Sequence, residues 1–97
     1  MNFLLDYGVK EETINKIKET ADESIIFYFL TKEKNVIEVI KYLSSIQIKV
    51  IDRLLVNRLE LFMLPVEKIK KQFENYNIEV LVQLINEDIN VLNNIGE

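Results

Sequence analysis

The chain has 97 residues, of which 48% are hydrophobic and 29% are charged, and it carries a net charge of −4 at pH 7. These values indicate one small folded domain and argue against a disordered chain. The absence of cysteine excludes a disulfide framework and a thiolate metal site, and the absence of histidine removes the side chain that most often acts as acid or base near neutral pH.

The amino terminus, MNFLLDYGVKEE, has no basic lead and no apolar stretch of signal-peptide length. The longest uninterrupted apolar run, residues 25–30 (IIFYFL), is far shorter than the roughly 20 residues that a membrane-spanning helix needs. We therefore expect a cytoplasmic protein that does not insert into a membrane.

Helical spacing and capping residues organise the first half of the chain. Gly8 follows a short apolar run, where a left-handed helix C-cap needs glycine. Asp22 suits the N-cap of a helix through residues 25–30, and Thr31 suits the N-cap of the next helix. That next helix carries four apolar residues at helical spacing: Val36, Val39, Ile40 and Leu43.

Two apolar runs permit a second interpretation. Residues 25–30 (IIFYFL) and 59–64 (LELFML) are short and rich in β-branched, aromatic or other apolar residues, as buried strands are. We favour helices for both, because two isolated strands in a helical chain would leave uncovered sheet edges.

The second half of the pattern starts at Pro65, the only proline. Its fixed φ and its missing N–H suit the first position of a helix. Asn77 either ends that helix or caps the next one. The helix after Pro65 carries a stripe of four residues on one face: Val66, Ile69, Phe73 and Tyr76.

Nine helical segments are predicted: 2–7, 11–20, 23–30, 33–44, 48–56, 58–63, 66–76, 78–86 and 88–95, the last of them ended by Gly96. A long, a medium and a short segment begin at Glu33 and again at Val66, an offset of 33 residues. Such a period is typical of helical solenoids, whose units bury their apolar faces against their neighbours. We therefore predict a single all-α domain over residues 1–97, a solenoid-like array of about two and a half three-helix units with candidate repeats at 1–32, 33–65 and 66–97.

The junctions between these segments resemble the helical repeats of the mitochondrial transcription termination factor family. Residues 7–9 (YGV) resemble that family's first junction, residues 58–62 (RLELF) its short element of the Pro-Glu-Leu-Leu kind, and residues 66–68 (VEK) the start of its next helix. The resemblance implies a curved solenoid that grips double-stranded nucleic acid.

Several positions depart from the family pattern. Leu59 stands where the family usually has proline, Lys10 stands where a serine cap is common, and Ser44 and Ser45 replace the glycine of the second junction. Family members are also generally longer and basic, whereas this chain has a net charge of −4.

Catalytic side chains are scarce. The adjacent acids Glu11-Glu12, Asp22-Glu23 and Glu87-Asp88 each lie at a predicted helix start, where the helix dipole favours acids, and helical neighbours point to different faces. Two glycines far apart in the sequence cannot form a phosphate-binding loop. We therefore expect no enzyme, no cofactor, no metal and no small-molecule ligand.

The aromatic residues fit a core better than a base-stacking platform. Phe27, Phe29, Phe62, Phe73 and Tyr76 fall on apolar faces or in apolar runs, which favours packing in the core. For two others, Tyr28 and Tyr42, solvent exposure is left open.

Charge is distributed unevenly along the chain. Residues 1–38 have a net charge of −3, residues 39–72 of +4, and residues 73–97, which hold no basic side chain, of −5. If the basic residues of the middle segment converge, they form a phosphate-binding patch, although a solvated surface is the favoured interpretation. The seven candidates are Lys41, Lys49, Arg53, Arg58, Lys68, Lys70 and Lys71.

Together these patterns predict a non-catalytic helical-repeat binding module. The favoured partner is a protein or a second copy of the chain, and double-stranded nucleic acid is the alternative. The candidate interface is an apolar stripe of Ile89, Leu92 and Ile95, for which no succeeding helix provides cover.

Overall fold

The computed structural model describes residues 1–94, which form helices and no strand. The nine elements of this part are η1 (Asn2–Tyr7), α1 (Glu11–Thr20), α2 (Glu23–Thr31), α3 (Glu33–Ser45), α4 (Ile51–Asn57), η2 (Leu59–Met63), α5 (Val66–Glu74), α6 (Ile78–Glu87) and η3 (Ile89–Asn94), where η denotes a 3₁₀ helix.

The predicted all-α class is confirmed. The two runs for which strands were the alternative lie in α2 and η2. The largest boundary error is at α4, which begins at Ile51 rather than at residue 48, because the preceding residues form the turn that follows α3. The predicted cap Gly96 lies outside the described residues.

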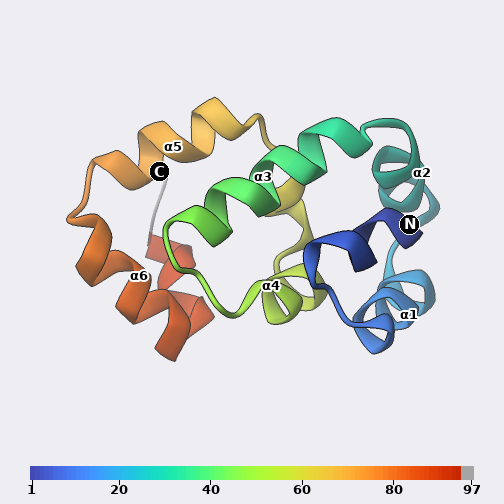
Figure 1. The fold of residues 1–97 in the computed structure, drawn as a ribbon, viewed down its shortest axis with the longest axis horizontal. Helices are drawn as coiled ribbons and strands as arrows, with labels where there is room; N and C mark the ends of the chain where they lie inside the picture. The colour runs from blue at the N-terminus through green and yellow to red at the C-terminus, as the bar shows by residue number, and fades with distance from the viewer. Residues whose placement is uncertain (95–97) are drawn as a thin grey trace.

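Helix α3 is the centre of the arrangement. It contacts η1 and α2 on one side, α4 and η2 below, and α5 on the other side (Figure 1). The described structure measures 34 × 23 × 23 Å, with α1 and α2 toward one end of its long axis and α6 toward the other (Figure 1).

One continuous hydrophobic core runs through the described residues, from Leu4 to Leu92. Phe29, Phe62 and Phe73 are buried in it, as predicted. The core prediction is wrong for Phe27 and Tyr76, whose exposed fractions are 66% and 44%. Phe27 lies on the face of α2 opposite Phe29, and Tyr76 lies beyond the end of α5. Tyr28 and Tyr42 are half-buried.

Two junctions end the preceding helix with a residue in the left-handed region. Gly8 has a φ of 86° and donates its N–H to Leu5, as expected for a glycine C-cap. Gln47 has a φ of 73° and donates to Ser44 in the same way. The second left-handed residue was not predicted, because glutamine carries no signal for this conformation.

The other caps agree with the sequence in part. Asn77 caps α6, and its Oδ1 accepts a hydrogen bond from the Val80 N–H at 3.2 Å. Pro65 is the N-cap of α5 rather than its first residue. Thr31 does not cap α3, because it is the last residue of α2 and its hydroxyl donates to the Phe27 carbonyl.

Two consecutive sets of elements have the same order. Both α3–α4–η2 and α5–α6–η3 consist of two α-helices followed by a 3₁₀ helix, whereas η1 and α1–α2 place the 3₁₀ helix first. The expected long-to-medium order holds for α3 and α4 but not for α5, which has 9 residues against 10 in α6. The repeat therefore stays a prediction.

Candidate binding surfaces

The seven basic residues lie on several faces. Lys41 and Lys70 line a shallow hollow between α3 and α5, together with Tyr42 and the acids Glu38 and Glu67. A hollow of about 250 Å³ between η2, α5 and η3 is lined by Arg58 and Lys68, with an apolar floor of four residues: Leu61, Leu64, Phe73 and Leu92.

The remaining three basic residues lie apart from one another. Lys49 follows α3 and lines a hollow beside α6 that also holds Glu79 and Glu87. Arg53 is exposed on α4 and Lys71 is exposed on α5. In Figure 1, α5 lies along the upper edge of the molecule and α4 along the lower edge.

Three of these cations already have partners. Lys41 Nζ lies 5.8 Å from the centre of the Tyr7 ring, and Lys70 Nζ lies 5.6 Å from the centre of the Tyr42 ring. Arg58 Nε lies 3.4 Å from the Glu60 carboxylate, and its Nη1 donates to Asn93 Oδ1. At Lys49 the backbone N–H, rather than the side chain, donates a hydrogen bond to Asn86 Oδ1 at 2.8 Å.

The Tyr42 hydroxyl has a perturbed pKa. Burial raises the pKa of its hydroxyl above the ordinary 10.0, and the nearby Glu74 carboxylate raises it further, because both disfavour a phenolate. This perturbation reflects the packing of α3 against α5, where the Tyr42 ring contacts the Phe73 ring.

The polar side chains between helices hold the fold together. Asp52 Oδ2 accepts from the Lys10 N–H at 2.9 Å and from the Thr13 hydroxyl at 2.7 Å, which ties α4 to the start of α1. Asn86 joins α6 to the α3–α4 junction, since its Nδ2 also donates to the Gln47 carbonyl at 3.0 Å.

The expected stripe on the last helix is corrected by the structure. Ile89 and Leu92 are buried, with exposed fractions of 8% and 7%, because η3 folds back against α6. Ile95 lies outside the described residues.

An apolar surface is instead exposed on α6 and just before it. We call Tyr76, Val80 and Leu84 the α6 surface; their exposed fractions are 44%, 53% and 43%. They line a hollow of about 170 Å³ together with Asn77 and Leu81. The sequence analysis missed this surface, since α6 has apolar residues on nearly every side and periodicity did not show which side packs inward.

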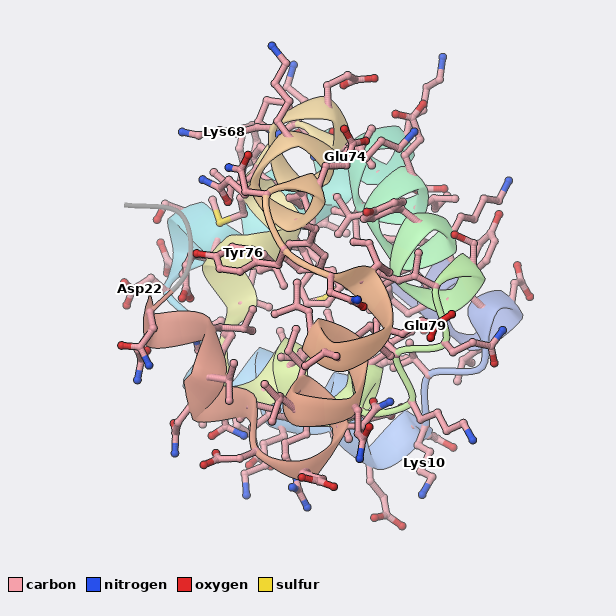
Figure 2. All side chains as sticks on the ribbon, turned by 90° about the vertical axis from the view of Figure 1, so that its left-hand side faces the viewer. Lys10, Asp22, Lys68, Glu74, Tyr76 and Glu79 are labelled. Carbon is pink, nitrogen blue, oxygen red and sulfur yellow. The ribbon has the colours of Figure 1, made fainter. Side chains whose placement is uncertain are left out.

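Four carboxylates lie on α6 or close to its two ends in the sequence. Glu74, Glu79, Glu87 and Asp88 are all exposed, and among residues 1–94 none of them forms an ion pair with a lysine or arginine. Figure 2 shows this end of the molecule, with Tyr76, Glu74 and Glu79 on the side that faces the viewer. The carboxylates of the segment without basic side chains therefore lie at this end, where Figure 2 also shows Lys68 of α5.

A second apolar surface lies toward the opposite end. Phe27 and Leu30 of α2 have exposed fractions of 66% and 55%, and we call this pair the α2 surface. The two surfaces lie on helices at opposite ends of the long axis (Figure 1).

No family model, curated protein or solved structure matches the chain significantly. No group of three or more metal-ligating side chains occurs within residues 1–94, and no helix there is long and apolar enough to cross a membrane.

Proposed function

We propose that this chain is a non-catalytic helical binding module that docks another protein through the α6 surface. The observation that carries the proposal is the line of three exposed apolar side chains, Tyr76, Val80 and Leu84, around one hollow. Single exposed apolar residues are normal on a soluble protein, whereas a contiguous apolar patch with a polar rim is typical of an interaction site.

A helical-repeat architecture is part of the proposal. Its support is the recurrence of one set of contacts at two places, namely a left-handed helix end bonded to an Asp or Asn side chain of a later helix. In such arrays each unit buries its apolar face against the next, and the exposed outer surfaces serve for binding. We also propose a cytoplasmic location, which the lack of cysteine supports.

Site-specific photo-crosslinking in cells tests the docking surface. A photoreactive amino acid at Val80 is expected to form adducts with a protein, whereas the same group at Lys71, an exposed helical position on α5, should not. Adducts that are absent at Val80, or equally abundant at both positions, would overturn the proposal.

Double-stranded nucleic acid is the second candidate, as the family resemblance implies. It is favoured by the hollow between α3 and α5, where Lys41 and Lys70 gather beside Tyr42. It predicts an affinity that falls steeply with salt and is lost when Lys41 and Lys70 are both changed to Glu. A flat titration with duplex DNA and duplex RNA at low salt would exclude it.

A further inference from the structure

The α6 surface combines an apolar stripe with carboxylates on and next to α6, and the two features together restrict its partner. Val80 and Leu84 lie one turn apart, about 6 Å along the helix axis, and Tyr76 extends the stripe beyond the N-cap Asn77. The stripe therefore matches the length over which a short helix presents two or three anchor residues.

A helix fits this surface better than an extended strand. Strand addition requires a free sheet edge, and residues 1–94 contain no strand. Helix-in-groove recognition instead uses apolar anchors at i, i+3 or i+4, and i+7, a spacing that suits residues four apart on α6. The hollow of about 170 Å³ is large enough for one anchor, since a cavity of about 150 Å³ accepts a benzene-sized group.

The carboxylates on and next to α6 indicate the charge of the partner. Glu87 follows Leu84 by three residues, about one helical turn, Asp88 is the C-cap that comes next, and Glu79 directly precedes Val80. Lys49 lines a hollow with Glu79 and Glu87 on one flank of α6 but forms no ion pair within 4.0 Å with either of them. These carboxylates attract a basic segment and repel an acidic one.

The same charges disfavour two other occupants. A second copy is disfavoured where it would dock through its own α6 surface, from a segment of net charge −5, or its α2 surface, from a segment of net charge −3. A contact with its basic segment, residues 39–72 of net charge +4, is distinguished by the sedimentation experiment below. An anionic membrane surface attracts basic segments and would be repelled by exposed carboxylates.

We infer that the α6 surface takes a basic amphipathic helix of another protein. Its apolar residues pack on Tyr76, Val80 and Leu84, and its lysines or arginines lie beside the carboxylates of Glu79, Glu87 and Asp88. This inference rests on the proposed function and adds the chemistry of the partner.

The test uses the full chain as bait against a displayed library of 16-residue helical peptides. Every peptide has apolar residues at i, i+4 and i+7, and each flanking position is randomised between Lys and Glu. Peptides with a clear excess of Lys are expected to be enriched. Their affinity, measured by fluorescence anisotropy, should fall at least tenfold with the bait Val80→Asp/Leu84→Asp and should also fall with added salt.

Two further variant baits separate the effect of charge at the α6 surface from a general loss of folding. The variant Phe27→Asp/Leu30→Asp alters the α2 surface in a matched way and should keep the affinity. The variant Glu79→Lys/Glu87→Lys changes only exposed side chains and should shift the enrichment toward Glu-rich peptides.

The outcomes distinguish the inference from the proposed function. Enrichment without charge preference, unchanged preference in the Glu79→Lys/Glu87→Lys bait, or no enrichment overturns the basic helix, while photo-crosslinks at Val80 would keep the docking surface. A dimer in sedimentation that Val80→Asp/Leu84→Asp dissociates assigns the surface to a second copy and also overturns the inference. If a photoreactive group at Val80 forms no crosslinks, both the basic-helix inference and the proposed docking surface are overturned.

Discussion

The junction after η1 and the junction after α3 end their helices by the same hydrogen-bonding scheme but with different residues. The left-handed residue donates its N–H three residues back, and the following residue donates five residues back: Gly8 to Leu5 and Val9 to Leu4 in the first junction, Gln47 to Ser44 and Ile48 to Leu43 in the second. A side chain of a later helix then bonds to each junction, Asp52 to the first and Asn86 to the second.

The aromatic residues near the junctions do not correspond in position. Tyr7, one residue before Gly8, lies beneath Lys41, whereas Tyr42, five residues before Gln47, lies beneath Lys70. The difference between the junctions is chemical: glycine and a charged acceptor in one, glutamine and a neutral amide in the other. The two junctions therefore share their backbone geometry although their residues differ. Substitutions at each junction measure how much each residue type contributes to the free energy of unfolding.

The largest effect is expected for Asp52→Ala in the first junction. This change removes the acceptor for the Lys10 N–H and leaves the buried Thr13 hydroxyl unpaired. Hydrogen bonds to charged groups contribute about 1.5–3 kcal/mol each, so we expect the free energy of unfolding to fall by about 2–3 kcal/mol. Urea denaturation measures it.

Asp52→Asn is the matched control, because it keeps an acceptor and loses only the charge, as in the second junction. We expect it to cost about 1 kcal/mol. If Asp52→Ala destabilises no more than Asp52→Asn, the carboxylate does not hold α4 against α1.

A smaller loss is expected for Asn86→Ala in the second junction. Both bonds of this side chain, to the Lys49 N–H and to the Gln47 carbonyl, join neutral groups, so their loss should cost about 1–2 kcal/mol. Faster amide hydrogen exchange at Lys49 should accompany it. Asn90→Ala is the control, since the Asn90 side chain is exposed on η3; an equal loss there would contradict this assignment.

These two junctions also mark where sequence reasoning succeeds and fails. Gly8 was assigned correctly, and of the two roles left open for Asn77 the structure shows the N-cap, because both conformations depend on local chemistry. Gln47 was missed, because its left-handed conformation is held by α3 ending against a later helix rather than by its own preference.

The candidate surfaces depended still more on tertiary structure. Periodicity showed that α6 is apolar but not that Leu81, Val82 and Ile85 face the core while Val80 and Leu84 face solvent. Likewise, the basic residues cluster in sequence but five of them line three different hollows, which no local pattern shows.

Substitutions at the two left-handed residues are expected to change the free energy of unfolding in opposite directions. Gly8→Ala should lower the free energy of unfolding by about 1 kcal/mol, from the left-handed backbone alone, since no atom lies within 4 Å of the added Cβ. Gln47→Gly should raise it by about 0.5 kcal/mol, because relief of the same strain exceeds the entropy gained by the unfolded chain. Thermal denaturation of both variants measures these changes. A change in the same direction in both variants would contradict the prediction.

The smallest effect at neutral pH is expected for Tyr42→Phe, which tests the aromatic residue before the second junction. The folded protein raises the Tyr42 pKa, first through burial and then through Glu74, so the unfolded chain loses the phenolic proton first as pH rises above about 10. The folded state then binds more protons than the unfolded state, and stability falls from pH 10 up to the folded-state pKa. Tyr42→Phe should remove this part of the decline, as measured by urea denaturation between pH 8 and pH 11. Glu74→Gln removes only the second cause and should reduce the decline in part. A decline that is unchanged in Tyr42→Phe would show that other groups set the alkaline limit and that the packing of α3 on α5 does not depend on a neutral phenol.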